Sequence, residues 1–478
     1  MACSTIESYD QKIQHFPTRA IDFIGRTIND LHVRRVESPN ESGQSQDRWD
    51  MYDYGSFSFD SKSEVLEKAK RYWNPDKTQF WTDSGIDLVI GRREGYVLWD
   101  MEGRRLIDLH LNGGTYNLGH RNPEVVAAVA EGLELFDIGN HHFPSVARTA
   151  LAEALVQTAP AGLTKVAFAS GGGEAIDIAL KSARHATQKR KIVSIVKAYH
   201  GHTGLAVGTG DDRFAKLFLA DRPDEFIQVP FGDLDAMDKA LSGRDVAAVI
   251  METIPATYGF PLPEPGYLEA VKAMTEAYDA LYIADEVQTG LMRTGELWGI
   301  TKHGIDPDIM VTGKGISGGI YPIAAVLLSD RAGQWLEQDG FGHISTFGGA
   351  ELGCVAALKT LEITTRPQVR SMVHYISELM GAGLRRIQDQ YPGWFAEIRQ
   401  NGVILGLRFD HPEGAKFVMR QLYELGVWAI FSTLDPRVLQ FKPGILMSRE
   451  LCEDVLDRVE VAVGRARDDV HNSDRRAI

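Results

Sequence analysis

Polar residues that can bind or react follow five short apolar stretches of the sequence. They are Gly171-Gly172-Gly173 after KVAFAS, Tyr199 and His200 after KIVSIV, Glu252 after VAAVIM, Asp285 after ALYIA, and Lys314 after DIMVTG. Glycine amides can bind an anion, an aromatic ring can stack on a planar group, and an amine can attack an electrophile. These residues act together only if the fold brings them to one place.

The segments around these residues alternate between apolar strands and amphipathic helices. The stretch GGGEAIDIALKSARHATQK, for example, follows KVAFAS and carries Ile178, Ala179 and Ala183 at helical spacing. Such alternation predicts an α/β fold with a mostly parallel sheet covered by helices on both faces. Because parallel strands end at the same edge of a sheet, we expect the five stretches to meet there.

The two ends of the chain differ from this middle part. YVLWDMEGRRLIDLH predicts a β-hairpin around Met101-Glu102-Gly103, Ile21–Leu31 predicts a short helix, and the polar stretch Arg34–Ser63 is typical of a surface arm. After about Thr365, a long amphipathic helix, short strands and a final helix predict a smaller α+β domain. We therefore divide the chain into an N-terminal arm (1–90), an N-terminal part of the small domain (91–125), a large domain (126–365) and a C-terminal part of the small domain (366–478).

Composition excludes several classes of function. The chain has 478 residues, enough for a large core and a smaller companion domain, and its net charge of −14 argues against nucleic acid or an anionic membrane as its partner. It shows neither a secretory signal nor an apolar run of membrane length. Cys3, Cys354 and Cys452 are too far apart for a disulfide framework or a metal site. We expect a cytoplasmic protein.

The glycine and lysine stretches each allow two interpretations. Gly171–Gly173 precede a helix and could bind phosphate through backbone N–H groups, although three glycines alone are more often a plain turn. Lys314 could be an ordinary surface charge, or a buried amine with a lowered pKa and raised nucleophilicity. It is not a Walker lysine, because glycine follows it. The glycines beside it, Gly313 and Gly315, predict a sharp turn of the backbone.

The carboxylate and aromatic residues are equally open when taken singly. Asp285 could cap a helix or pair with a protonated pyridine nitrogen, and the adjacent Glu286 is the better candidate for a salt bridge. Tyr199 could simply pack or could stack on a flat ring. His200 and His202 have no third metal ligand near them in sequence, so we expect no metal. Together, a phosphate nest, a stacking ring, a carboxylate and a lysine are what pyridoxal phosphate needs.

At these residues the chain resembles the class III (omega) aminotransferases of the fold-type-I pyridoxal-phosphate enzymes. The resemblance runs from about Gly95 to about Met447. It rests on LIDLHLNGGTYNLGHRNPEV, SGGGEAIDIALKSAR, AYHGHTG, IADEVQTGLMRTGELW, DIMVTGKGISGGIYPIAAVLLS and STFGGAELGCVAALKTLE. It implies a large pyridoxal-phosphate-binding domain with a mostly parallel seven-stranded sheet, and a smaller α+β domain formed from both chain ends.

The resemblance also implies a role for each site residue. Lys314 forms the Schiff base and moves the proton, Asp285 keeps the pyridine nitrogen protonated, and Tyr199 stacks on the ring with His200 beside it. Gln288 bonds near the phenolic oxygen, Gly172 and Gly173 bind the phosphate, and Glu252 lines the substrate side. Thr346 reaches the phosphate of a neighbouring subunit, which implies a homodimer with shared active sites.

One departure from the family pattern affects the expected substrate. Many members carry an arginine three residues before a proline near the C-terminal end, where it grips an α-carboxylate. The corresponding stretch here is VLQFKPGIL, with Gln440 in that position. A neutral amide cannot provide the charged, forked grip of a guanidinium. Arg437 and Lys442 are the nearby cations that could replace it.

Three hypotheses follow. The first is an aminotransferase that moves an amino group from an amine or omega-amino acid to a keto acid, such as pyruvate or 2-oxoglutarate, in two half-reactions. The second keeps the cofactor but changes the outcome to that of a lyase, an aminomutase or a racemase, as the missing arginine allows. The third is a nucleotide-binding module that uses Gly171–Gly173, which leaves Lys314 and Asp285 unexplained.

Overall fold

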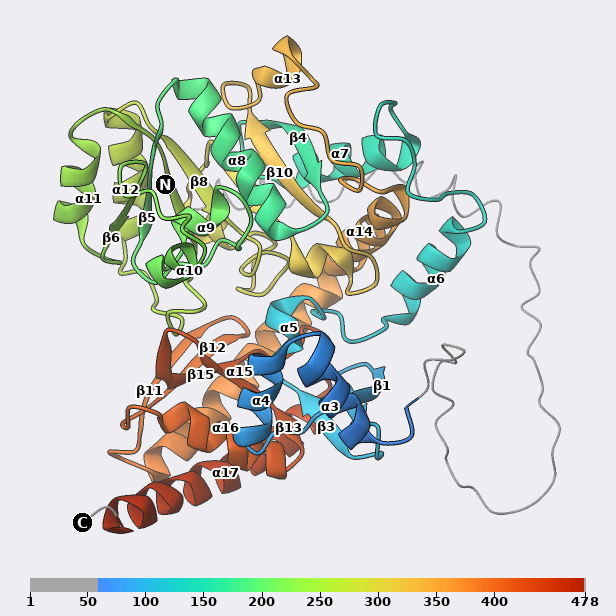
Figure 1. Cartoon of the computed structure of the whole chain (residues 1–478), viewed down its shortest axis with the longest axis vertical. Coiled ribbons are helices and arrows are strands. Elements are labelled where there is room, and N and C mark those ends of the chain that lie inside the picture. The colour runs from blue at the N-terminus through green and yellow to red at the C-terminus, as the bar shows by residue number, and fades with distance from the viewer. Residues whose placement is uncertain (1–58, 477–478) are drawn as a thin grey trace. The chain divides into compact units, whose positions relative to one another are not determined.

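The computed structural model describes residues 59–476, and from Asp60 onward these belong to one compact unit, Asp60–Ile478 (Figure 1). The expected helix at Ile21–Leu31 and most of the expected surface arm lie outside the described residues. The boundaries proposed above between arm, large domain and small domain stay predictions.

A seven-stranded sheet forms the centre of the large domain. Its strands run in the order β4-β10-β9-β8-β7-β5-β6. They span Leu163–Ala169 (β4), Ala324–Ser329 (β10), Ile309–Thr312 (β9), Leu281–Asp285 (β8), Val246–Glu252 (β7), Lys191–Ile195 (β5) and Phe226–Val229 (β6). β10 is antiparallel to both of its neighbours, and the other pairs are parallel. The predicted mostly parallel sheet is confirmed.

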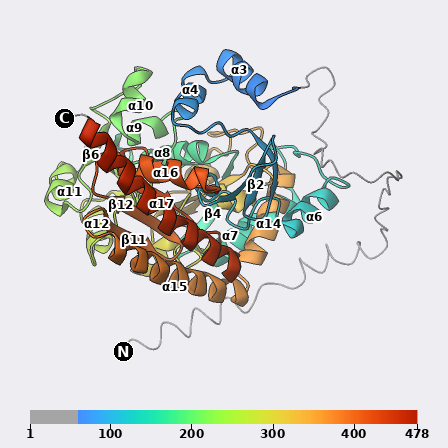
Figure 2. The same cartoon turned by 90° about the horizontal axis from the view of Figure 1, so that it is seen from below.

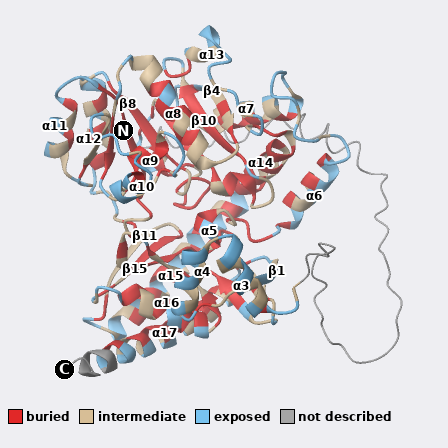
Figure 3. Ribbon diagram, viewed as in Figure 1, coloured by how far each residue is buried: buried red, intermediate tan, exposed pale blue. Residues whose placement is uncertain are grey.

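Helices cover both faces of this sheet, which explains why its central strands are apolar throughout. Every residue of β7 and β8 is buried (Figure 3). On one face, Leu281 and Ile283 pack with α8 (Gly172–Thr187). On the other, Tyr282 and Ala284 belong to a cluster with residues of four helices: α7 (Val146–Thr158), α11 (Leu234–Leu241), α12 (Tyr267–Ala277) and α14 (Glu351–Thr364). The two faces are therefore separate apolar layers.

Both ends of the described chain build the small domain. One sheet runs β1-β2-β3-β13 and the other β11-β12-β15-β14. The strands span Ile90–Glu94 (β1), Val97–Asp100 (β2), Arg105–Asp108 (β3), Phe395–Asn401 (β11), Ile404–Phe409 (β12), Val427–Trp428 (β13), Ile430–Ser432 (β14) and Asp435–Phe441 (β15). β2 and β3 form the predicted hairpin, and β3 pairs in parallel with β13 from the other chain end.

Three long helices pack on these small sheets. α15 (Pro367–Gln390) and α16 (Gly414–Glu424) both contact α17 (Arg449–Arg476), which crosses the domain beside them (Figure 2). Their apolar faces enter one core with residues of β3, β12 and β15. The long helix and the final helix predicted after Thr365 are thus confirmed.

Shorter elements connect these layers. They are α3 (Lys62–Tyr72), α4 (Pro75–Asp83), α5 (Leu111–Gly114), α6 (Pro123–Gly132), α9 (Ala206–Thr209), α10 (Asp212–Leu217), α13 (Trp335–Gln338) and the 3₁₀ helices η1 (Gly299–His303) and η2 (Lys314–Ser317). Two of them matter for the site. η2 begins at Lys314, and α5 contains a kink with positive φ at Asn112 and Gly113.

Candidate active site

A cavity of about 170 Å³ lies where the parallel strands end. Its lining includes Gly172, Gly173, Tyr199, His200, Glu252, Asp285, Gln288 and Lys314. Asp285 and Glu252 are the last residues of neighbouring strands and stand directly opposite each other in register. The sequence-based expectation that these strand ends converge therefore agrees with the geometry, because every residue predicted for the site except Thr346 lines this cavity.

Asp285 and His200 form a buried pair at the floor of the cavity. Nδ1 of His200 lies 2.7 Å from Oδ2 of Asp285, and Oδ1 of Asp285 accepts a hydrogen bond of 3.0 Å from the Val287 amide. The second ring nitrogen of His200, Nε2, is buried without a hydrogen-bond partner. The pair can therefore hold a proton or a cationic group that approaches from the cavity.

Glu252 is a second buried carboxyl group in the same cavity. Its two oxygens accept hydrogen bonds from the backbone amides of Tyr199 (3.1 Å) and Ala256 (3.0 Å). Burial raises its pKa to about 7, with Asp285 adding to the rise and His200 opposing it. Glu252 can therefore gain or lose a proton near neutral pH.

Lys314 lines the same cavity, near enough to both carboxyl groups for their charges to act on its amine. Burial lowers the pKa of Lys314, while Asp285 and Glu252 work in the opposite direction. Within residues 59–476, no side chain forms an ion pair with it. A lowered pKa leaves more of the amine neutral, which is the nucleophilic form.

The backbone around Lys314 differs from the sequence-based expectation. The strained residue is Lys314 itself, with φ +42°, whereas Gly313 is extended with φ −166°. The glycines therefore do not make the turn, and that expectation was wrong. Gly315 instead allows close packing of its neighbours, because a Cβ there would lie 3.1 Å from Leu291 Cδ1 and 3.2 Å from the Gly114 carbonyl oxygen.

Helix α8 begins two residues earlier than predicted, at Gly172 rather than near Glu174. Gly172 and Gly173 are therefore its first turn, where N–H groups have no acceptor within the helix, and both residues line the cavity. Glu174 folds back instead, since its Oε2 accepts from the Ser170 amide (2.8 Å) and hydroxyl (2.5 Å). The turn leaves backbone donors available to an anion.

Tyr199 and Gln288 complete the lining. Tyr199 is half-buried and makes an edge contact with His202, whose own ring packs on Phe214. Gln288 Oε1 is buried and has no hydrogen-bond partner. The histidines predicted not to bind metal are thus engaged with Asp285 and Phe214. Among residues 59–476, no cluster of three or more His, Cys, Asp or Glu side chains is arranged to hold a metal ion.

Two predicted residues behave differently from the rest. Thr346 lies on an exposed loop before α14, away from the cavity lining. Glu286, expected in a salt bridge, instead accepts hydrogen bonds from the amides of Gly299 (2.7 Å) and Ile300 (2.8 Å) and from the Thr253 hydroxyl. It fixes the loop after β8, so the salt-bridge expectation was wrong.

The sequence alone missed two residues beside Lys314, Gly113 and His110. Gly113 has φ +71°, and a Cβ there would lie 3.0 Å from Lys314 Cε. The pKa of His110 falls to about 3, first through burial and then through the charges of Lys442 and Lys314. Lys442, which the sequence analysis had named beside Gln440, is fully buried and does not line the cavity. The one available signal was NGGT, whose glycines marked a close backbone approach.

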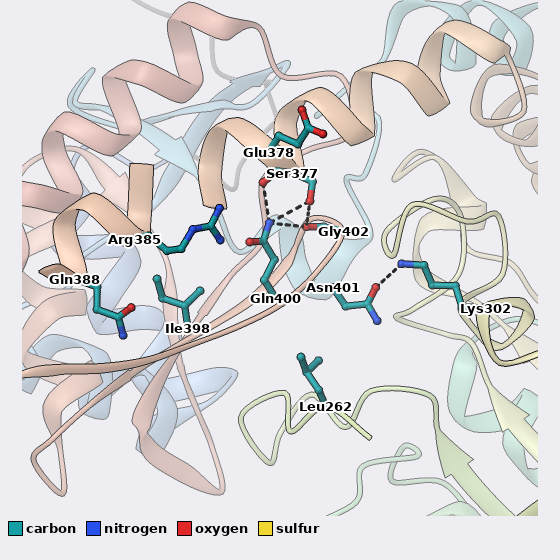
Figure 4. A pocket seen from close by; sticks show the side chains of 10 residues that line it. All are labelled: Leu262, Lys302, Ser377, Glu378, Arg385, Gln388, Ile398, Gln400, Asn401 and Gly402. Atoms are coloured by element: carbon teal, nitrogen blue, oxygen red, sulfur yellow. Dashed lines mark hydrogen bonds between the residues drawn. The ribbon is translucent and has the colours of Figure 1, made fainter. Parts of the chain in front are cut away.

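A larger crevice of about 600 Å³ lies elsewhere, beside α15 and β11 (Figure 4). Its polar groups bind one another: the Gln400 amide donates to Ser377 and Gly402, and Lys302 donates to Asn401. It contains none of the residues singled out from the sequence. We therefore place the chemistry in the smaller cavity.

Comparison with known proteins agrees with this fold and site. Residues 81–463 match the family model "Aminotransferase class-III". An "Uncharacterized aminotransferase" of Archaeoglobus fulgidus is 41% identical over 402 residues, covering 84% of this chain and 94% of that protein.

Solved structures share the fold. An ornithine aminotransferase from Toxoplasma gondii superposes with a TM-score of 0.79 at 24% identity, covering 87% of this chain and 97% of that one. An N-acetylornithine aminotransferase from Stenotrophomonas maltophilia gives 0.69 at 26% identity, covering 81% and 98%. With the family model spanning most of its length, the chain belongs to the class III aminotransferase family and is an enzyme of the aminotransferase type.

Proposed function

We propose that this enzyme uses pyridoxal phosphate to move an amino group from an amine or omega-amino acid to a keto acid, such as pyruvate or 2-oxoglutarate. The observation that carries the proposal is the position of the Lys314 amine, in one small cavity with the buried Asp285–His200 pair and the first turn of α8. The two half-reactions then use the same site in turn, in ping-pong order.

The residues present suit this cofactor. The free N–H groups of Gly172 and Gly173 match its phosphate, and the orphaned Gln288 Oε1 and His200 Nε2 are buried polar atoms that lack a partner within the described chain. The Asp285 carboxylate matches a protonated ring nitrogen. When bound, pyridoxal phosphate supplies an electron sink for the carbon that loses its proton.

Each side chain of the site then has a distinct task. With the cofactor bound, Lys314 would provide the covalent attachment point and would carry the proton, since its lowered pKa lets it exist in both forms. Asp285, oriented by Val287 and His200, would keep the ring nitrogen protonated. Tyr199 would stack on the ring, Gln288 would bond near its phenolic oxygen, and Glu252 would line the substrate side.

We further propose a homodimer in which Thr346 reaches the partner subunit's phosphate site. Exposed apolar side chains lie on the segment that carries Thr346 and on the segment that follows α6; they are Phe341, Ile344 and Phe347 on the first, and Leu133, Leu135, Phe143 and Val146 on the second. Two segments supply them, and these touch where His142 meets Phe341. An apolar surface of this extent favours burial against another subunit.

A cytoplasmic location remains part of the proposal. Cys354 and Cys452 are buried free thiols, as a reducing compartment favours. Within the described residues, no helix has both the length and the apolar character to cross a bilayer.

The second candidate is a lyase, an aminomutase or a racemase that uses the same cofactor. The neutral Gln440, buried and bonded to Ala256, favours it, because no arginine is available there for a keto acid's carboxylate. A donor panel of omega-amino acids, diamines, aryl-alkyl amines and amino-phosphates, each with and without pyruvate or 2-oxoglutarate, separates the two. Turnover that requires a keto acid supports transamination, and turnover without one supports the alternative.

A further inference from the structure

Glu174 joins the start of helix α8 to the loop between α13 and α14. On the helix side, its Oε2 accepts hydrogen bonds from the amide and the hydroxyl of Ser170, at 2.8 Å and 2.5 Å. Ser170 and Glu174 flank Gly171–Gly173 in the sequence. The side chain of Glu174 therefore closes the glycine turn, and its negative charge suits a helix N-terminus.

The remaining partners of Glu174 come from the loop. Burial raises the pKa of Glu174, but hydrogen bonds from the hydroxyls of Ser170 and Ser345 more than offset this, and the pKa lies below its ordinary value. His343 Nε2 lies 3.5 Å from Glu174 Oε1. Lys181, also on α8, donates to Nδ1 of His343 at 2.7 Å, which leaves the proton of a neutral ring on Nε2. The ionised carboxylate thus attracts both loop residues.

The same loop is held closely on both sides of Thr346. After it, a Cβ on Gly348 would lie 2.7 Å from the Phe168 carbonyl oxygen, and a Cβ on Gly349, where φ is +68°, would lie 3.0 Å from the Phe168 side chain. Arg148 Nε donates to the Gly349 carbonyl at 2.8 Å. Before it, Ser345 contacts Glu174. Thr346 itself is exposed, so these contacts fix its backbone and leave its side chain accessible.

Glu174 therefore contacts two groups that belong to different cofactor sites in the proposed homodimer. Gly172 and Gly173 line the cavity of their own subunit, whereas Thr346 is not among the described residues that line it. The exposed Thr346 is the residue proposed to reach the partner subunit. Because one carboxylate contacts both the glycine turn and the Thr346 loop, a change at Glu174 acts on both.

We propose that Glu174 is a positioning residue for two phosphate sites of the homodimer: it shapes the glycine turn of its own subunit and, through Ser345, presents Thr346 to the partner subunit. The proposal rests on the cofactor and the homodimer proposed above. It predicts that the loss of one Glu174 charge weakens cofactor binding in both subunits. A carboxylate with a purely local role would affect only the subunit that carries it.

Three variants separate the two roles. Glu174→Gln keeps the shape and removes the charge, whereas Ser345→Ala removes only a contact to the loop. Glu337→Gln is the matched control, because it neutralises an exposed carboxylate on α13 that pairs with Lys165 instead. Absorbance titration of the cofactor-free enzyme gives the dissociation constant of pyridoxal phosphate. Light scattering and melting temperature report the oligomer and the fold of each variant.

Mixed dimers show which subunit each variant affects. One subunit carries Lys314→Ala, so that only the other subunit can attach the cofactor covalently. Glu174→Gln is placed either in the subunit that keeps Lys314 or in the subunit that lacks it. Two affinity tags on co-expressed chains isolate each mixed dimer, and the absorbance band of lysine-bound cofactor then reports its single competent site.

We expect Glu174→Gln to weaken cofactor binding at the competent site roughly 10-fold in both mixed dimers. Ser345→Ala should do so only from the subunit that lacks Lys314, and Glu337→Gln should match wild type in both positions. If Glu174→Gln affects only the subunit that carries it, the link to Thr346 is wrong. If Glu174→Gln does not fold, Ser345→Ala decides alone: no effect from the subunit that lacks Lys314 contradicts the proposal.

Inorganic phosphate gives a readout that does not involve Lys314. In cofactor-free homodimers, we expect phosphate to raise the melting temperature of wild type and Glu337→Gln at concentrations roughly 10-fold lower than those needed by Glu174→Gln or Ser345→Ala. Equal responses contradict the proposal. If wild type transfers no amino group but phosphate binding shifts as expected, the proposed function fails and the role of Glu174 stands. A monomeric wild type overturns the homodimer and this proposal together.

Discussion

Two cavities of this enzyme differ in size and in chemistry, and the smaller one holds the polar atoms that lack a partner. The crevice beside α15 has a volume of about 600 Å³ and the cavity at the strand ends about 170 Å³. In the crevice, Gln400 and Lys302 are bonded to their own neighbours. In the cavity, His200 Nε2 and Gln288 Oε1 have no partner within the described chain. Unmet polar atoms and perturbed acids identify a reactive site better than volume does.

Removal of Lys314 gives the sharpest test of that contrast. We expect Lys314→Ala to lower turnover roughly 10⁴-fold or more and to abolish the absorbance band of lysine-bound cofactor, because both covalent attachment and proton transfer are lost. Lys302→Ala, in the crevice, is the matched control. A comparable loss of turnover in both variants would contradict our assignment of the chemistry to the smaller cavity.

Neutralising Asp285 is expected to have the next largest effect. Asp285→Asn keeps the shape but removes the charge paired with His200, so we expect turnover to fall roughly 10²- to 10³-fold. Steady-state rates with the best donor measure this. Asp435→Asn, on β15, serves as the control and should stay near wild type. An unchanged rate for Asp285→Asn refutes the assigned role.

Glu252 should make stability depend on pH in a predictable direction. Its folded pKa of about 7 exceeds the ordinary 4.5, so the folded state binds more protons between those values. Stability therefore falls as pH rises through this window, by up to about 3 kcal/mol. Glu252→Gln removes the effect. Relative to wild type, the cofactor-free variant should gain thermal stability between about pH 5 and about pH 8; a constant difference argues against the raised pKa.

Gly113 tests how closely the loop must approach Lys314. Gly113→Ala adds a Cβ 3.0 Å from Lys314 Cε at a residue with φ +71°, and we expect it to cost about 1–3 kcal/mol and to slow cofactor attachment. Gly95→Ala is the control, since it has φ +54° and open space around its Cβ. Melting temperatures and attachment rates are compared. Equal attachment rates would show that the approach to Lys314 is not tight.

The crevice provides the smallest expected effect. Arg385→Gln changes an exposed side chain that lines the crevice. We expect the free energy of unfolding to stay within about 0.5 kcal/mol of wild type and the turnover rate to stay unchanged. Kinetics and melting temperature suffice as measurements. A large loss of activity would mean that the crevice takes part in the reaction after all.

Sequence patterns predicted the parts of the site that local chain order controls. Apolar runs that alternate with helices indicate where parallel strands end. Asp285, Glu252 and Lys314 could therefore be predicted to lie in one site from the sequence alone. Family resemblance then supplied Gln288 and Thr346, which periodicity does not mark. What escaped prediction depends on contacts between distant segments. Gly113, in the loop after β3, lies against the Lys314 side chain only because the fold brings these two segments together.

Local backbone and hydrogen-bond details also escaped prediction. The strain at Lys314 was assigned to its glycine neighbours, because glycine is the residue that usually accepts positive φ. Glu286 was assigned an ion pair, yet backbone amides satisfy it. A one-dimensional pattern shows that a carboxylate is buried but not which donors will meet it.

The parallel pairing of β3 with β13 has a consequence for how this protein is made. Ile107 pairs with Val427, so the small domain joins residues from near both ends of the described chain. During synthesis the strands of the central sheet emerge in the interval, and domains generally fold as units as the chain emerges. The edge of β3 in the β2–β3 hairpin therefore stays unpaired until Val427 has been synthesised. Truncation before Val427 should leave β3 without its partner strand, and the exposed apolar edge should then favour aggregation.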